Sequence, residues 1–307
     1  MSSPSGSSSS GRRERDGSSR RRLAPPMTAS QAEAVPRRPS PSALEAGTRA
    51  HYEDARHYTA NYRDRVEDID YYLELARTVG GRVLEYGCGN GRIALPLAHA
   101  GVEVTGVDLS APMLADLRAR LRRAGPEVGS RVVVRRGDMR RLALGRRFEL
   151  VLCTFNTFLH LYTRTDVERF LARVRAHLAP RGRFVFDVSV PMAEELARDP
   201  ARVFRAPRFR HGGTGELVRY GEQFRYDPLT QVQLVDMIFE PVGAPARRWV
   251  TPLAHRQFFP QELEALLHYN GFDVLLQHAD HESKPPDVET TTLIYHCRAR
   301  RQAARRA

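Results

Sequence analysis

Between residues 82 and 188, short apolar runs alternate with longer segments whose apolar residues recur every three or four positions. The short runs predict β-strands, and the longer segments predict amphipathic helices. Strands are expected at 82–86, 102–107, 131–136, 148–153 and 183–188, and helices at 92–100, 111–123 and 166–178. Apolar strands joined by helices are typical of a parallel sheet that is covered on both faces.

The flanking regions have different patterns. Residues 51–79 have helical spacing, whereas alternating runs within residues 195–256 predict an antiparallel β insertion. A helix that starts at Pro260 and strands at 272–277 and 291–297 follow. We therefore predict a Rossmann-like α/β fold. Its doubly wound, seven-stranded, mostly parallel sheet carries the antiparallel insertion over the C-terminal ends of the strands.

The first strand runs into a loop with three alternating glycines, Gly87, Gly89 and Gly91, preceded by Glu85. Glycine permits positive φ angles and leaves no Cβ between the backbone and a ligand. A dinucleotide-binding loop needs its third glycine at the position that Arg92 occupies. The loop therefore favours a ligand other than a pyrophosphate. A nicotinamide-dependent Rossmann oxidoreductase and a tight turn without a ligand are the alternatives.

Polar residues follow the next three strands of the expected sheet. Asp108 lies seventeen residues after Gly91, about where nucleotide-binding folds present a carboxylate to ribose hydroxyls. Asp138 follows the third strand and Asn156 the fourth. Taken alone, Asp108 is equally consistent with a helix-capping acid, and Asp138 would more often be a turn residue than a ligand-binding one. The carboxyl ends of parallel strands meet at one edge of a sheet, so a shared site is predicted there.

These motifs and their intervals resemble class I S-adenosylmethionine (SAM) methyltransferases over roughly residues 50–298. The run Gly137-Asp138-Met139-Arg140 and the later insertion are similar to the small-molecule group that includes sugar-amine N-methyltransferases. The resemblance implies SAM as cofactor, with Asp138 accepting from adenine and Met139 packing on the ring. It also implies a hydroxyl group from one of the tyrosines on the first helix, Tyr52, Tyr58 or Tyr62, without indicating which, and amphipathic packing of all three is the alternative. The implied cofactor-binding residues are Tyr62, Glu85, Gly87, Gly89, Gly91, Asp108, Leu109, Asp138, Met139, Thr154 and Asn156.

Catalysis of methyl transfer depends mainly on alignment, and a base is needed only when the nucleophile arrives protonated. His160, four residues after Asn156, is the candidate base, and simple packing is the alternative. Arg256, at the end of the insertion, is the candidate partner for an anionic substrate group, and a solvated strand end is the alternative.

The net charge of +12 lies mostly outside the predicted fold. Nine Arg against four acids in residues 1–50, and five Arg without an acid in residues 298–307, account for ten of these charges. We therefore expect no nucleic-acid partner. An RNA methyltransferase is also disfavoured, because Thr154-Phe155-Asn156-Thr157 replaces the Asn/Asp-Pro-Pro-aromatic motif of base-modifying relatives.

The Ser-, Arg- and Pro-rich residues 1–45 predict a disordered tail. Residues 46–298 are expected to form the methyltransferase domain, with 195–256 as a substrate lid, and residues 299–307 a basic C-terminal tail. Cys88, Cys153 and Cys297 lack metal-binding spacing, so no metal site is expected. Without a predicted membrane span, a cytoplasmic enzyme is expected. Its predicted reaction is SAM-dependent methylation of N or O on a small molecule, and a non-catalytic SAM-binding module is the alternative.

Overall fold

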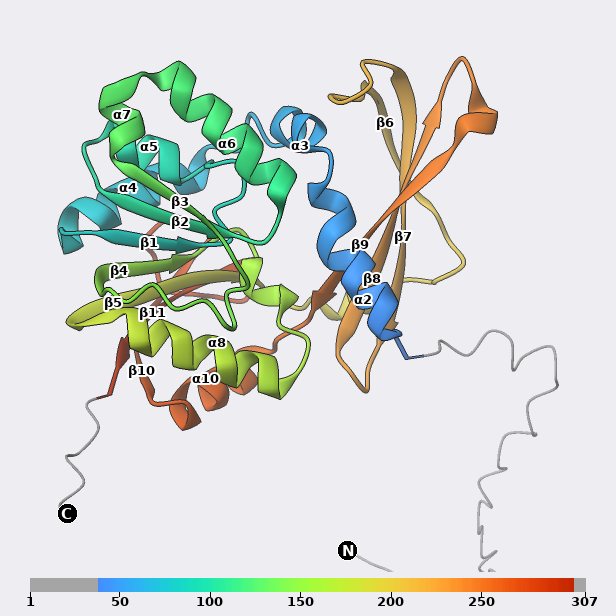
Figure 1. Ribbon diagram of the computed structural model, residues 1–307. Helices are drawn as coiled ribbons and strands as arrows, with labels where there is room; N and C mark the ends of the chain where they lie inside the picture. The colour runs from blue at the N-terminus through green and yellow to red at the C-terminus, as the bar shows by residue number, and fades with distance from the viewer. Residues whose placement is uncertain (1–37, 301–307) are drawn as a thin grey trace, which may run out of the picture. The chain divides into compact units, whose positions relative to one another are not determined.

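The computed structural model describes residues 38–300, which form two β-sheets and their covering helices (Figure 1). The N-terminal helices are α2 (Pro41–Arg49), η1 (Ala50–Tyr52), α3 (Ala55–Asn61) and α4 (Glu67–Val79). The first sheet contains β1 (Val83–Tyr86), β2 (Val104–Asp108), β3 (Val132–Arg136), β4 (Phe148–Cys153), β5 (Leu178–Ser189), β10 (Phe272–Ala279) and β11 (Thr292–Ala299). Its connecting helices are α5 (Ala94–His99), α6 (Ala111–Ala124), α7 (Pro126–Ser130), η2 (Thr157–His160), α8 (Arg164–His177) and α10 (Pro260–Tyr269).

The seven strands have the order β10-β11-β5-β4-β1-β2-β3. Strands β1 to β5 pair in parallel, whereas β11 is antiparallel to both β5 and β10. The predicted seven-stranded, mostly parallel sheet is confirmed. The strand order reverses between β1 and β4, and ligands of such sheets bind beyond the carboxyl ends of the strands at this point.

Both faces of the seven-stranded sheet are buried, as its continuous apolar runs predict. Side chains alternate along each strand, so Leu84 of β1 packs toward α8 and α10, whereas Val83 packs toward α4 and α5. Figure 1 shows these helices on opposite sides of the sheet. The sheet is therefore a rigid platform whose loops carry the polar residues.

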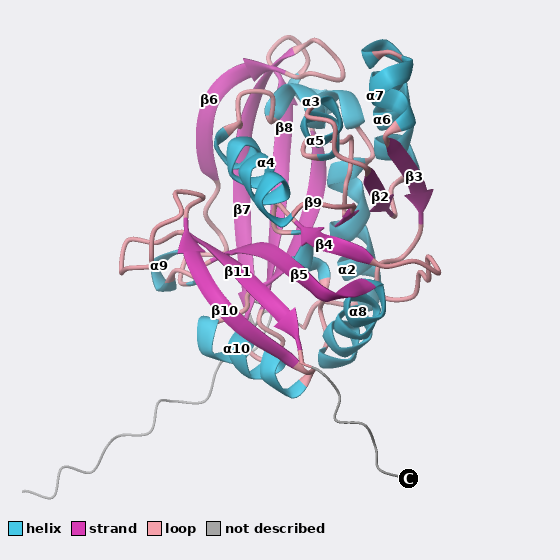
Figure 2. Ribbon diagram, turned by 90° about the vertical axis from the view of Figure 1, so that its left-hand side faces the viewer, coloured by secondary structure: helices cyan, strands magenta, loops and turns pink. Residues whose placement is uncertain are grey.

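The insertion forms a separate four-stranded antiparallel sheet with the order β6-β7-β8-β9 (Figure 2). Its strands are β6 (Phe204–Arg210), β7 (Leu217–Asp227), β8 (Val232–Pro241) and β9 (Trp249–Arg256), and α9 (Ala193–Leu196) and η3 (Pro245–Arg247) are short helices of the region. Strand β9 contacts α2, η1 and η2. The approach of α2 is close, because a Cβ on Gly47 would lie 2.5 Å from the Cβ of Ala254.

Two boundaries differ from the prediction. The expected helix over 51–79 is broken, because α3 ends at Asn61 and α4 begins at Glu67. Pro41–Arg49 forms α2, so the tail predicted for residues 1–45 is wrong at its C-terminal end. Ser40 caps the N-terminus of α2, and Gly47 within α2 packs on β9. The rest of that tail, residues 1–37, and residues 301–307 lie outside the described residues. None of the helices within 38–300 has the length and apolar character to cross a membrane.

Candidate active site

A cavity of about 470 Å³ lies at the carboxyl ends of β1, β2 and β3. Its wall combines the loops after these strands with η1, α3 and the segment after β4. Residues 195–256 do not contribute to the wall, because the N-terminal helices α2 and η1 contact β9 and themselves face the cavity. The insertion therefore packs against the helices that form part of the wall. None of its residues lines the cavity, so no contact supports its expected role as a substrate lid.

The glycine loop reaches the cavity at Gly87 and Gly89. Gly91 has a φ of 81°, and a Cβ there would lie 2.3 Å from Cδ1 of Leu117. The third glycine is thus required by the packing of α6 against the loop, and it is absent from the cavity wall.

Arg92 occupies the position of the last glycine in a dinucleotide-binding loop, and its guanidinium connects two neighbouring segments. Nη1 donates to Asp68 Oδ1 at 2.6 Å and to the carbonyl of Arg65 at 3.2 Å. The same group lies 4.3 Å from the ring centre of Phe155, which lines the cavity. Arg92 therefore joins the start of α4 to the loop that follows β4.

Asp108 ends β2 and presents its carboxylate to the cavity. Oδ2 accepts from the backbone N–H of Gly89 at 2.8 Å, and Oδ1 accepts from that of Ser110 at 2.7 Å. Burial raises the pKa of Asp108, and the backbone N–H donors oppose that rise. A carboxylate has about four acceptor positions, so two remain for hydroxyl donors of a ligand.

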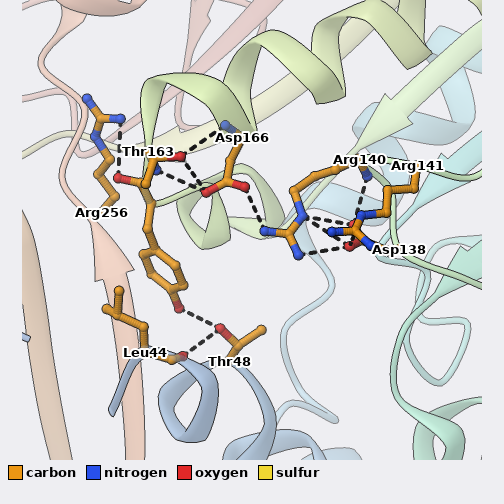
Figure 3. A network of polar contacts seen from close by, with 9 residues as sticks. Leu44, Thr48, Asp138, Arg140, Arg141, Thr163, Asp166 and Arg256 are labelled. Carbon is orange, nitrogen blue, oxygen red and sulfur yellow. Dashed lines mark hydrogen bonds and ion pairs between the residues drawn. The ribbon is translucent and has the colours of Figure 1, made fainter. Parts of the chain in front are cut away.

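Asp138 and Met139 line the cavity after β3. Arg140 donates to both carboxylate oxygens of Asp138, with Nη2 2.8 Å from Oδ2, and its Nη1 lies 2.7 Å from Asp166 Oδ1. Figure 3 shows Arg140 between the two acids. Burial raises the pKa of Asp138, but hydrogen bonds from Arg140 outweigh this effect and lower it. Arg140 therefore fixes an ionised acceptor in the wall.

Glu85 is 2% exposed and is not part of the cavity wall. Thr154 donates to its Oε1 at 3.3 Å, whereas Oε2 has no hydrogen-bond partner among the described residues. Burial raises the pKa of Glu85 to about 7. A buried carboxylate oxygen without a donor is costly, and Oε2 therefore leaves an acceptor position open beside the glycine loop.

His160 ends η2, lines the cavity and lies among other rings. Its Nε2 lies 2.8 Å from the hydroxyl of Tyr52, and its ring centre lies 5.0 Å from that of His255 on β9. Burial, and secondarily the charge of His51, lower the pKa of His160 to about 4. Burial likewise lowers the pKa of His51 to about 4, and it lowers the pKa of His255 well below its ordinary value. These imidazoles are therefore neutral at pH 7.

Arg256 does not reach the cavity. Its guanidinium pairs with Glu262 and lies 4.4 Å from the ring centre of Phe258. Successive residues of a strand face opposite sides, so His255 faces His160 while Arg256 faces α10. The structure thus does not support Arg256 as the predicted substrate-binding residue, and its neighbour is the residue that approaches the site.

Seven of the predicted site residues share the cavity wall: Gly87, Gly89, Asp108, Leu109, Asp138, Met139 and His160. The others, which the structure does not bring to this wall, are Tyr62, Glu85, Gly91, Thr154, Asn156 and Arg256. The prediction did not include Tyr52, Tyr58, Phe155, Thr157 and Tyr162, all of which line it. The helical pattern of residues 51–79 does not distinguish Tyr52 and Tyr58 from Tyr62, and it gives no sign of the break between α3 and α4. In the described part of the chain, His, Cys, Asp and Glu side chains form no cluster suited to a metal ion.

Comparisons with known proteins agree with this architecture. The family described as "Methyltransferase domain" matches residues 83–182. A dTDP-3-amino-3,6-dideoxy-alpha-D-glucopyranose N,N-dimethyltransferase from Streptomyces fradiae is 33% identical over 122 residues, which are 40% of this chain and 45% of that protein. A putative methyltransferase, YqeM, from Bacillus subtilis (strain 168) is 31% identical over 118 residues, 38% of this chain and 46% of that protein. The chain spans about half the length of the curated relatives it matches.

Among solved structures, the CcbJ methyltransferase from Streptomyces caelestis has a TM-score of 0.70 at 26% identity, over 83% of this chain and 99% of that chain. SAM-bound CalS10, an amino pentose methyltransferase from Micromonospora echinaspora, has a TM-score of 0.58 at 23% identity, over 78% and 95% of the two chains, and supports the fold alone. Residues 83–182 therefore match a methyltransferase-domain family, and the fold of the chain is that of the class I SAM-dependent methyltransferases.

Proposed function

We propose that this protein is a SAM-dependent methyltransferase that methylates an amine or hydroxyl group of a small molecule. One observation carries the proposal: the residues after β1, β2, β3 and β4 that the sequence motifs single out converge on one cavity. Its volume of about 470 Å³ lies within the usual range of small-molecule sites. The enzymes with related sequences include an aminosugar N,N-dimethyltransferase, which supports an amine acceptor.

The wall of the cavity fits the nucleoside part of the cofactor. In this proposal, Asp108 accepts the ribose hydroxyls, because its two oxygens keep free acceptor positions. Leu109 and Met139 supply apolar surface for adenine, and Asp138 accepts from the adenine amino group. The unpartnered Oε2 of Glu85 supports a role for this carboxylate toward the cofactor's ammonium group.

When bound, SAM would supply a sulfonium methyl carbon for in-line attack by the nucleophile, and the sulfur would leave as a neutral thioether with the electron pair of the broken C–S bond. The chain's own residues exclude water and orient the nucleophile at the inner end of the cavity. His160 in the cavity wall and the nearby His51 are neutral at pH 7, since burial lowers the pKa of each to about 4. A base with so low a pKa is poorly matched to an ammonium, and burial disfavours the charged amine as well. We infer that an amine acceptor is methylated in its neutral form, with His160 orienting it, and that the resulting ammonium loses a proton to solvent afterwards.

Turnover with an acceptor panel tests this function. The full chain is incubated with SAM and separate amino sugars, amino acids and phenols, and S-adenosylhomocysteine (SAH) release and acceptor mass are followed. We expect acceptor-dependent SAH release and the addition of a methyl group to an amine or hydroxyl compound. SAM binding without acceptor-dependent release across the panel would instead support a non-catalytic binding module.

A further inference from the structure

Asp187 is a buried carboxylate on β5 that the proposed reaction does not use. Its side chain is enclosed, with the residue only 2% exposed. Oδ2 accepts from the hydroxyl of Tyr72 at 2.6 Å and from the backbone N–H of Phe155 at 2.9 Å. Oδ1 accepts from the backbone N–H of Asn156 at 2.8 Å. Burial of a carboxylate is tolerated when it has such donors, so this arrangement is specific.

The turn that Asp187 holds is strained. Phe155 and Asn156 have φ angles of 55° and 62°, and both are non-glycine residues in the left-handed region. L-residues adopt this conformation only when the surroundings determine it. The two successive N–H groups converge on one carboxylate, in the way that consecutive backbone N–H groups form anion-binding concavities.

A second set of contacts fixes the same turn. The Asn156 side-chain amide donates from Nδ2 to Ser189 Oγ at 2.9 Å, and its Oδ1 accepts from the Ser189 backbone N–H at 2.7 Å. Ser189 ends β5, two residues after Asp187. The carboxyl end of β5 therefore fixes the backbone that follows β4.

The opposite side of this turn forms part of the cavity. Phe155 and Thr157 line it, and the guanidinium of Arg92 lies 4.3 Å from the ring centre of Phe155. Thr157 begins η2, which ends at His160. If the turn relaxed to ordinary φ angles, Phe155 and the start of η2 would move with it.

We propose that Asp187 is a positioning residue of the cofactor and acceptor site, acting through the Phe155–Asn156 turn. This inference rests on the proposed function. Removing the charge of Asp187 leaves two backbone donors with a weaker acceptor, so the strained turn opens more often. The effect should reach Phe155 and His160 without any contact between Asp187 and a ligand.

The test compares Asp187→Asn with a matched control, Asp227→Asn. Asp227 is also buried, at 7% exposed, and holds the turn after β7 by accepting from the Leu229 backbone N–H at 3.0 Å and from Thr230 Oγ1 at 2.6 Å. For both variants of the full chain, SAH affinity is measured by calorimetry. Hydrogen–deuterium exchange of the peptide spanning 154–160 and the separate kcat and KM values are measured in parallel.

We expect Asp187→Asn to weaken SAH binding about tenfold or more and to speed exchange within 154–160. We also expect it to lower kcat more than it raises the acceptor KM. Asp227→Asn should match the wild type in all three measurements. Wild-type SAH affinity and exchange in Asp187→Asn would overturn the inference. If the wild type itself binds no SAH, the proposed function fails and this inference fails with it.

A second variant covers the case in which Asp187→Asn does not fold. Ser189→Ala removes the acceptor of Asn156 Nδ2 at the same turn and leaves Asp187 in place. We expect faster exchange within 154–160 and a smaller loss of SAH affinity, of about two- to fivefold. Unchanged exchange and affinity in Ser189→Ala, together with unfolded Asp187→Asn, would assign Asp187 to the core alone and overturn the inference.

Discussion

The hydroxyl of Tyr52 lies 2.8 Å from Nε2 of His160, although 108 positions separate the two residues. This contact joins η1 to η2 at the cavity wall. Ser110 also holds η1 in place, because its Oγ donates to the carbonyl of Tyr52 at 3.1 Å. The N-terminal helices and the loops at the strand ends therefore form the cavity wall together.

Replacing His160 tests whether it orients the acceptor or removes a proton. If it orients, His160→Ala should lower kcat by about tenfold, while kcat/KM in both proteins falls as pH drops through the acceptor's own pKa. Burial lowers the pKa of His160 to about 4, so its protonation should affect the wild type only near that pH. Tyr52→Phe, which removes only the hydroxyl partner, is the control and should have a smaller effect. A wild-type inflection near pH 6.5 that disappears in His160→Ala would contradict this role.

Asp108→Asn should weaken SAH binding without unfolding the protein. The amide keeps one acceptor but loses the charge that the ribose hydroxyls and the Gly89 backbone N–H favour. The loss corresponds to about 1.5–3 kcal/mol, or roughly ten- to a hundredfold in Kd. Calorimetry with SAH measures it, and circular dichroism verifies the fold. Unaltered affinity would remove Asp108 from the cofactor site.

Glu85→Gln should separate stability from cofactor binding. Burial raises the pKa of Glu85 from its ordinary value to about 7, so the folded state binds a proton that the unfolded state releases. This contribution to stability is present at low pH and is lost as pH rises through about 7. At pH 8 the variant should be more stable by roughly 1–3 kcal/mol in urea denaturation, and its SAH affinity should be lower. Higher stability with unchanged SAH affinity would show that Glu85 affects stability and not cofactor binding.

Arg256→Gln should destabilise the protein and leave the acceptor KM unchanged. Its guanidinium pairs with Glu262 and packs over Phe258, and the residue is 9% exposed. Breaking a buried pair from one side costs about 3–5 kcal/mol, and the partial exposure of Glu262 places the expected loss at the lower end. Thermal unfolding and steady-state kinetics measure the two effects. A raised acceptor KM at unchanged stability would instead support Arg256 as a substrate-binding residue.

The sequence patterns predicted the seven-stranded sheet and the edge where the polar residues gather. They succeed because apolar periodicity and strand ends are local properties. Asp108 and Asp138 reach the cavity for this reason: each follows a strand whose neighbours are fixed by the parallel topology.

The remaining features depend on how distant segments pack. The sequence of α2 and η1 does not indicate that these helices pack between β9 and the cavity. The register of β9, with Arg256 opposite Val232, decides that His255 and not Arg256 faces His160. Helical spacing likewise could not select Tyr52 and Tyr58 over Tyr62, because it predicts one helix over 51–79, whereas η1 ends at Tyr52 and α3 ends at Asn61.

Equilibrium binding of SAM and SAH to the 307-residue chain, with NAD as the comparison ligand, tests most directly whether the cavity is a SAM site. We expect SAM and SAH to bind, Asp108→Asn to weaken both about ten- to a hundredfold, and excess NAD to displace neither. Binding of NAD without binding of SAM would contradict a SAM site and favour the nicotinamide-dependent alternative.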